Sequence, residues 1–271
     1  MTTFTNDSPN LAATYDRLSN SQFESGKRLV ERLAVGPGQR VLDVGCGTGR
    51  LARWIAERVS PGGAVVGVDP LPERVAIARE HAGAAGVTFE TGQAEDLGAF
   101  DAASFDAVSM SAVFHWIQDR RTALAEVRRV LRPGGRLGVT TLPRELTHAG
   151  TAAQVIAGVL SAAPYAARVD ISGFAIASRG LTTTELVTLV QDAGLELCEL
   201  HVMRRERTHA SGEELVDFMD ASSFGNFLRI VPEDVRPRFR ADLAAAFDAA
   251  RGPDGITLRD WGTLLVAERP A

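Results

Sequence analysis

The sequence predicts a doubly wound α/β fold built on a mostly parallel, seven-stranded sheet. Strand-like and helix-like segments alternate from residue 41 to residue 142, as in successive β-α-β units. A glycine-rich turn, Gly45 to Gly49, joins the first strand to a helix, and an acidic residue, Asp69, stands at the end of the second strand. Together these features predict a ligand site at the carboxyl ends of the strands.

Hydrophobic spacing gives the elements in order. Apolar positions recur at helical spacing from Leu11 to Leu33, which predicts two helices before the core. In the core, short apolar runs predict strands, and the amphipathic stretches between them predict helices. The strands are expected at 41–44, 64–69, 87–90, 105–110 and 136–142, and the helices at 51–59, 73–84 and 122–131.

The region after Pro143 is expected to contain a helical cap, because residues 143–179 are rich in alanine and show no clear strand pattern. Thr182 to Glu185 has the form of a capping box, which predicts a helix that closes at Gly194. A strand from Leu195 to about Arg205, helices within 211–250 and a terminal strand within 256–268 are expected to follow. We therefore expect one domain. Its core would comprise 36–142, 182–207 and 256–268, and its cap 1–35, 143–180 and 208–252.

Composition limits the possible partners. The chain has 271 residues and a net charge of -5, from 29 basic and 34 acidic residues, which disfavours nucleic acid. The amino-terminal segment has no signal-peptide pattern, and no apolar segment approaches the roughly 20 residues that span a bilayer. We expect a cytoplasmic protein, a monomer or homodimer, that acts on a small molecule. The two cysteines and five histidines show no metal-ligand spacing, so no metal is expected.

The glycine turn has the pattern Asp43-x-Gly45-x-Gly47-x-Gly49. Glycines here let a ligand approach the backbone and leave the amides of a helix N-terminus free to bind it. Arg50 stands where a dinucleotide-binding turn prefers a small residue, which disfavours a nicotinamide-dependent oxidoreductase. Asp69 is predicted to accept hydrogen bonds from both ribose hydroxyls of an adenosyl ligand; the alternative is a helix cap or turn residue.

Five segments, VLDVGCGTG, VVGVDP, TGQAEDL, FDAVSMSAVFHW and LRPGG, resemble the successive motifs of class I S-adenosylmethionine-dependent methyltransferases. This resemblance implies a Rossmann-like fold, S-adenosyl-L-methionine as the cofactor and S-adenosyl-L-homocysteine as its product. Gln93 stands where the family usually has an aspartate, and its amide oxygen can still accept a hydrogen bond from adenine. Tyr15 is expected to cover the cofactor, with burial as a core aromatic the alternative. The implied cofactor-binding residues are Tyr15, Asp43, Gly45, Cys46, Gly47, Asp69, Pro70, Leu71, Gln93, Ala94, Glu95 and Ser111.

A narrower resemblance links the chain to the type 11 branch of trans-aconitate and juvenile hormone acid methyltransferases. It is carried by HW followed by IQD, by Tyr15 with Gln22, and by the SFGNFLRIVPEDVR segment. Members of that branch methylate carboxylates of small organic acids. By this resemblance, Gln22 and Trp116 are expected to donate hydrogen bonds to a pair of substrate oxygens.

His115 is the candidate catalytic base, because histidine commonly accepts the proton in such reactions and the resemblance places this position beside the transferred methyl. The alternative is a histidine that only hydrogen-bonds its own loop. We expect methyl transfer to a small-molecule acceptor, by O-methylation of a carboxylate or hydroxyl. The alternatives are a C- or N-methyltransferase of a biosynthetic intermediate and a non-catalytic regulator that binds an adenosyl ligand.

Overall fold

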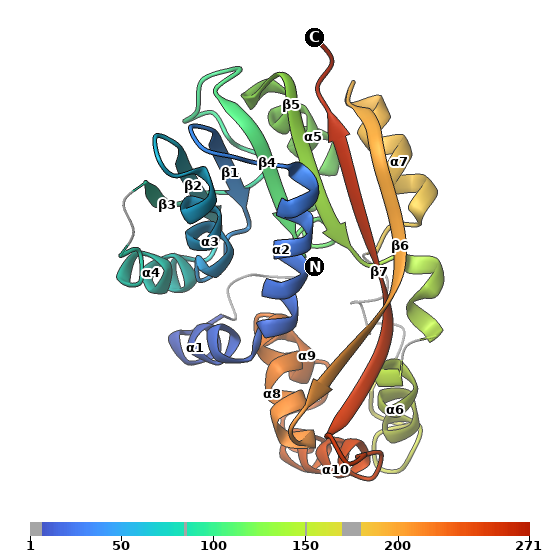
Figure 1. The fold of residues 1–271 in the computed structure, drawn as a ribbon. Helices are drawn as coiled ribbons and strands as arrows, with labels where there is room; N and C mark the ends of the chain where they lie inside the picture. The colour runs from blue at the N-terminus through green and yellow to red at the C-terminus, as the bar shows by residue number, and fades with distance from the viewer. Residues whose placement is uncertain (1–6, 84–85, 150, 170–179) are drawn as a thin grey trace. The chain divides into compact units, whose positions relative to one another are not determined.

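The computed structural model describes residues 7–83, 86–149, 151–169 and 180–271 (Figure 1). The chain divides into two compact units. Unit 1 comprises Met1–Ser19, Pro143–Gly180 and Met203–Gly262, and unit 2 comprises Asn20–Leu142, Leu181–Val202 and Thr263–Ala271. Two long strands, β6 and β7, contribute residues to both units.

The sheet has seven strands in the order β3-β2-β1-β4-β5-β7-β6. Neighbours from β3 to β5 are parallel, and β7 runs antiparallel to β5. The observed sheet confirms the predicted fold class, with the order reversing between β1 and β4, where ligands of such sheets bind. The strands are β1 (Arg40–Val44), β2 (Ala64–Asp69), β3 (Val87–Thr91), β4 (Phe105–Ser111), β5 (Leu131–Thr141), β6 (Glu196–His209) and β7 (Ile256–Glu268).

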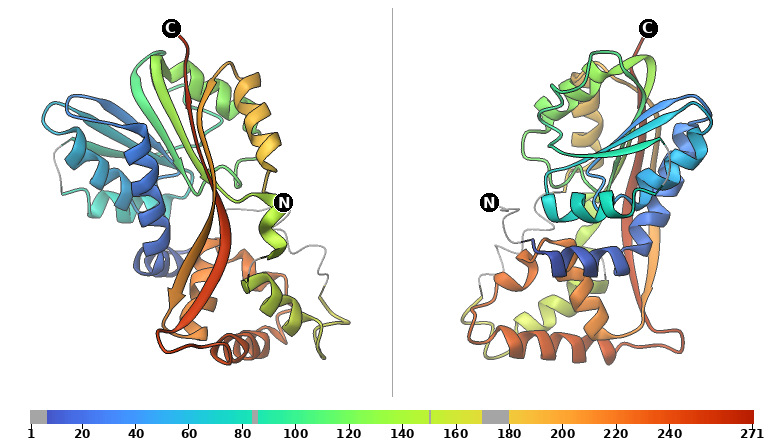
Figure 2. Two further views of the ribbon diagram at one scale, coloured as in Figure 1. Left: turned by 45° about the vertical axis from the view of Figure 1, so that its right-hand side comes forward. Right: turned by 90° about the vertical axis from the view of Figure 1, so that its left-hand side faces the viewer.

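Helices cover both faces of the sheet in unit 2. α2 and α3 pack together on one face, and α5 and α7 pack together on the other (Figures 1 and 2). Residues 1–35 were predicted to belong to the cap, whereas α2 packs against β4 and β5 through Leu29, Val30 and Leu33 on its apolar face. The helices of unit 2 are α2 (Asn20–Leu33), α3 (Arg50–Val59), α4 (Pro72–Glu80), α5 (Arg120–Val130) and α7 (Thr183–Asp192).

Two helix starts in unit 2 follow from side-chain caps. The predicted capping box is present: the Thr182 hydroxyl accepts the Glu185 amide N–H, and the Glu185 carboxylate accepts the Thr182 amide N–H. α5 begins at Arg120, two residues before the predicted start, because Asp119 accepts hydrogen bonds from the amide and the hydroxyl of Thr122.

Unit 1 is a set of helices around its own apolar core. That core includes the fully buried Leu215, Phe239, Leu243 and Phe247, together with Leu258 of β7. Residues 170–179 of the predicted cap lie outside the described residues. The elements of unit 1 are α1 (Pro9–Leu18), the 3-10 helix η2 (Arg144–Ala149), α6 (Thr151–Leu160), α8 (Gly212–Ser222), α9 (Asn226–Arg229) and α10 (Arg236–Asp248).

None of the helices in the described part of the chain has the length and apolar character needed to cross a bilayer.

Candidate active site

The glycine turn follows β1 and leads into α3. Gly45, Gly47 and Gly49 all have left-handed backbone conformations, with φ of 72°, 54° and 77°. The amides of Gly45 and Cys46 donate to the Val68 carbonyl at 2.7 and 3.0 Å, which anchors the turn to β2. Because L side chains rarely adopt such φ values, the predicted glycine pattern is a conformational requirement of this turn.

Asp69 ends β2 beside the turn, and its side chain is buried. Its Oδ2 accepts the Gly47 amide N–H at 2.9 Å, and its Oδ1 accepts the Leu71 amide N–H at 3.0 Å. One carboxylate therefore holds both the glycine turn and the start of α4. An ionised carboxylate can accept up to about four hydrogen bonds.

Asp43 lies in the central strand, between Gly67 of β2 and Ser109 of β4. It is buried, and its Oδ2 has no hydrogen-bond partner among the described residues. Burial raises the pKa of this carboxyl to about 7; Ser109 opposes the rise and the Asp69 carboxylate adds to it. A buried acceptor without a donor is unfavourable, so this position favours a ligand or water that supplies an N–H or O–H group.

The carboxyl end of β4 is fixed by β5. Ser111 Oγ lies 3.3 Å from Thr140 Oγ1, which also accepts the Ala112 amide N–H at 2.9 Å. Ala112 has a φ of 59°, an uncommon conformation for a residue other than glycine. The bonds to Thr140 hold this conformation, and they direct the chain into residues 113–119, which we call the acceptor loop.

His115 and Trp116 lie on the acceptor loop. His115 is buried, and its Nδ1 lies 3.3 Å from the hydroxyl of Thr141 at the end of β5. The centroids of the His115 and Trp116 rings are 5.2 Å apart, and the angle between the ring planes is 46°. Thr140 and Thr141, which were not predicted as site residues, orient Ser111 and His115 from a neighbouring strand.

The acceptor loop and α2 both approach the ends of the central strands. A Cβ built on Gly45 would lie 2.1 Å from Val113 Cγ2, so the loop contacts the glycine turn directly. A Cβ on Gly26 of α2 would lie 3.1 Å from Ser111 Oγ. Gln22 precedes Gly26 by four residues and therefore lies on the same face of α2. The predicted residues Gln22, Ser111 and His115 thus come from three segments that converge on one end of the sheet.

The loop after β3 carries Gln93, Ala94 and Glu95. Gln93 is exposed and Ala94 is buried. Glu95 Oε1 accepts the amide N–H groups of Gln118 and Asp119 at 3.3 and 3.4 Å. The side chain of Glu95 therefore connects its own loop to the acceptor loop, a role that was not predicted from the sequence.

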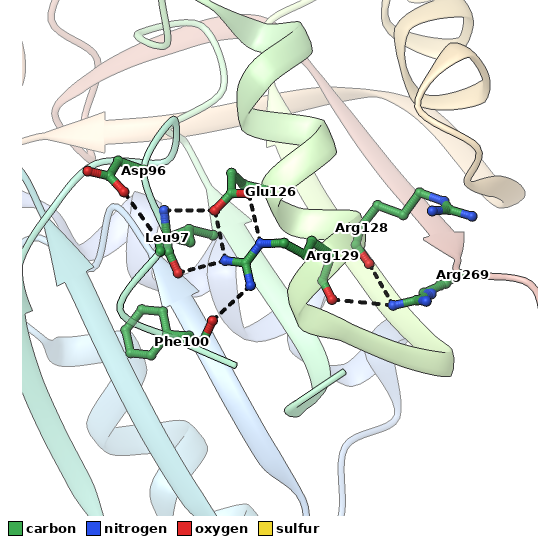
Figure 3. A network of polar contacts seen from close by, with 8 residues as sticks. Asp96, Leu97, Phe100, Glu126, Arg128, Arg129 and Arg269 are labelled. Carbon is green, nitrogen blue, oxygen red and sulfur yellow. Dashed lines mark hydrogen bonds and ion pairs between the residues drawn. The ribbon is translucent and has the colours of Figure 1, made fainter. Parts of the chain in front are cut away.

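An ion pair on α5 holds the continuation of the same loop (Figure 3). Arg129 donates to Glu126 at 2.8 Å, and also to the carbonyl oxygens of Leu97 and Phe100, both at 2.8 Å. Glu126 in turn accepts the Leu97 amide N–H at 3.1 Å. Charge-assisted bonds of this kind fix geometry well, so residues 97–100 are held against α5.

Three further predicted residues are Pro70, Leu71 and Tyr15. Pro70 and Leu71 follow Asp69 directly, and Leu71 is buried at the start of α4. Tyr15 lies half-buried on α1 in unit 1, and its place over the cofactor stays a prediction. Across the described residues, no three histidine, cysteine, aspartate or glutamate side chains form a group that would hold a metal ion.

Comparisons with known proteins assign the family. Residues 42–139 match the methyltransferase domain model. The chain is 31% identical over 215 residues to methyltransferase GfsG of Streptomyces halstedii, a match covering 77% of this chain and 70% of that protein. It is 33% identical over 188 residues to ubiquinone biosynthesis O-methyltransferase of Xanthomonas axonopodis, covering 67% and 74%. The chain belongs to the S-adenosylmethionine-dependent methyltransferases.

Further matches agree with this family. Nocamycin O-methyltransferase of Saccharothrix syringae is 38% identical over 134 residues, and that match spans 48% of each chain. The solved structure of the YcgJ protein from Bacillus subtilis aligns over 92% of this chain and 99% of that chain, with a TM-score of 0.61 and 20% identity. The structural match supports the class I methyltransferase fold. The narrower trans-aconitate and juvenile hormone acid branch stays a prediction.

Proposed function

We propose that this methyltransferase transfers a methyl group to an oxygen of a small-molecule acceptor, a carboxylate or a hydroxyl. The observation that carries the proposal is the convergence of the glycine turn, the acceptor loop and α2, through the contacts of Gly45 with Val113 and of Gly26 with Ser111. Two of the relatives described above are named O-methyltransferases, which supports oxygen as the acceptor atom.

The chain's own residues fit S-adenosyl-L-methionine. The glycine turn, whose left-handed backbone conformations suit glycine, would hold the amino-acid part, and the orphaned Oδ2 of Asp43 provides a buried polar atom beside that turn. The Asp69 carboxylate, at the end of β2 beside the glycine turn, would accept the ribose hydroxyls. Pro70, Leu71, Gln93 and the Ala94 amide would hold the adenine. When bound, the cofactor supplies a sulfonium-activated methyl group as the electrophile.

The acceptor loop then has two possible tasks, which depend on the acceptor. For a hydroxyl, His115 accepts the proton, and its contact with Thr141 fixes the orientation of the ring. A carboxylate is already ionised and needs no base. In that case Trp116 and Gln22 orient the two oxygens by hydrogen bonds, and positioning provides most of the rate.

Three variants test the proposal under saturating cofactor: His115→Ala, Trp116→Phe and Gln22→Ala. With a hydroxyl acceptor, His115→Ala should lower kcat by roughly 10²- to 10⁴-fold. With a carboxylate acceptor, Trp116→Phe and Gln22→Ala should have the larger effects, because misplacement by about 1 Å costs ~100-fold. Binding of S-adenosyl-L-homocysteine should stay near that of the unmodified protein in all three. Full activity of all three variants would refute the placement of the reacting centre at this loop.

A further inference from the structure

A cluster of charged side chains lies on the two strand segments of unit 1. Arg205 and Arg207 lie on β6, and Asp260 lies on β7. Arg205 Nε donates to Asp260 Oδ1 at 2.9 Å, and Arg207 Nη2 donates to Asp260 Oδ2. All three side chains are between 21% and 23% exposed. One carboxylate therefore bridges two guanidinium groups, which leaves the three groups together with an excess positive charge.

This cluster lies on the inner face of the strands. Side chains alternate between faces along a strand, so Asp260 lies on the same face as Ile256 and Leu258. Both of these residues are buried in the apolar core of unit 1. On the opposite face, Arg259 pairs with Glu206 at 2.7 Å, where the side chains are 52% and 57% exposed. The charges of the exposed pair, Arg259 and Glu206, cancel each other. In the inner cluster, two arginines face one aspartate, and the side chains are mostly shielded from water.

Two buried nitrogen atoms on this face lack partners. Arg207 Nε and His209 Nε2 have no hydrogen-bond partner among the described residues. The His209 side chain is 7% exposed, and its ring lies against that of Phe218, with 5.4 Å between the centroids. Burial lowers the pKa of His209 and the charge on Arg207 lowers it further, while the Glu214 carboxylate, 3.6 Å from Nδ1, opposes this shift. Buried polar atoms normally have hydrogen-bond partners. These two nitrogen atoms lack one, and both belong to the face that carries the excess positive charge.

The neighbouring glycine leaves room for the Arg205 guanidinium. A Cβ built on Gly262 would lie 2.8 Å from both Cδ and Nε of Arg205. The guanidinium therefore lies directly over the backbone of β7. Asp260 accepts the Nε–H of Arg205, and the planar fork carries further N–H groups on its two terminal nitrogens.

We propose that Arg205 and Arg207 form a binding site for the carboxylate or phosphate group of a small acidic ligand. Arginine forks bind both groups with paired, charge-assisted hydrogen bonds. Asp260 neutralises one of the two guanidinium charges and leaves one positive charge for the ligand to neutralise.

Calorimetry on the full chain, saturated with S-adenosyl-L-homocysteine at constant ionic strength, tests the site. The probes are inorganic phosphate, succinate and the neutral succinamide. We expect one of the two anions to bind and succinamide not to bind, and the anion that binds identifies the group. Arg205→Gln should weaken binding about tenfold or more, as expected for a lost charge-assisted hydrogen bond. Arg259→Gln is the matched control on the outer face of β7 and should leave binding within about twofold.

Asp260→Asn separates a binding site from a purely structural cluster. It removes the carboxylate that competes with the ligand, so anion binding should tighten in the folded variant. Absence of anion binding to the unmodified protein would overturn the proposal, as would equal effects of Arg205→Gln and Arg259→Gln. These measurements need no turnover, so their failure is distinguishable from failure of the proposed O-methylation, which the variants of the acceptor loop test.

Discussion

Replacing Asp43 by asparagine is expected to remove a pH dependence of folding stability that this carboxyl group creates. Burial raises the pKa of Asp43 from 3.8 to about 7. The folded protein therefore favours the protonated form, and the unfolded chain favours the ionised form. Stabilisation by the neutral group is fully present below pH 4, and it is lost as the pH rises through 7.

The magnitude follows from the shift of about 3 units, which corresponds to about 4 kcal/mol in total at 1.36 kcal/mol per unit. About 2 kcal/mol of this should be lost between pH 5 and pH 7. Asparagine has nearly the shape of a neutral aspartic acid and does not titrate in this range. The free energy of unfolding of Asp43→Asn, relative to the unmodified protein, should therefore increase by about 2 kcal/mol over the same interval.

Urea unfolding at several pH values between 5 and 8, without cofactor, measures this difference. Asp192→Asn is the control, because its carboxylate lies on the surface beside Arg121. The control should follow the pH profile of the unmodified protein. If Asp43→Asn also ran parallel to that profile, the assignment of a neutral, buried Asp43 would be refuted. A second readout is affinity for S-adenosyl-L-homocysteine, which we expect Asp43→Asn to lower.

Three further predictions concern the cofactor site and metal dependence. Asp69→Ala should weaken binding of S-adenosyl-L-homocysteine tenfold or more, since the lost hydrogen bonds to a charged acceptor are worth about 1.5–3 kcal/mol. Unchanged affinity of a folded variant, measured by calorimetry, would contradict this prediction. Gly45→Val should abolish cofactor binding, because φ is 72° and the new Cβ would meet Val113 at 2.1 Å, and retained binding would count against the proposed cradle. Methyl transfer should survive chelation by EDTA, and loss of turnover restored by magnesium would show that a metal takes part.

Local sequence signals predicted the core of this fold well. Three local signals depend only on neighbours within a few residues, and the structure has all of them: the apolar run before Gly45, the acidic end of β2 and the Thr182 capping box. The bounds of β6 were less predictable. This strand continues beyond Arg205 to His209, although its last residues are mostly charged. Its pairing with β7, more than fifty residues further along the chain, overrides the local preference.

The candidate site was predictable only where the residues themselves are distinctive. Glycines at left-handed positions and an aspartate after a strand are such signals, whereas Thr140 and Thr141 are ordinary strand residues. Their importance comes from the register of β5 beside β4, which pairs Ser111 with Thr140. That register is a property of the folded sheet, and one sequence does not reveal it.

Polar contacts at α5 connect the loop after β3, which is proposed to hold adenine, with the acceptor loop. Glu95, in the loop assigned to adenine, accepts amide N–H groups from the acceptor loop just before α5 begins. Asp119 caps the first turn of that helix, and the Glu126–Arg129 pair holds residues 97–100 along it (Figure 3). Because both loops are fixed to one helix, their relative positions are set by hydrogen bonds of defined geometry. Cofactor and acceptor must be aligned closely for methyl transfer, and α5 provides a common support for the residues proposed to align them.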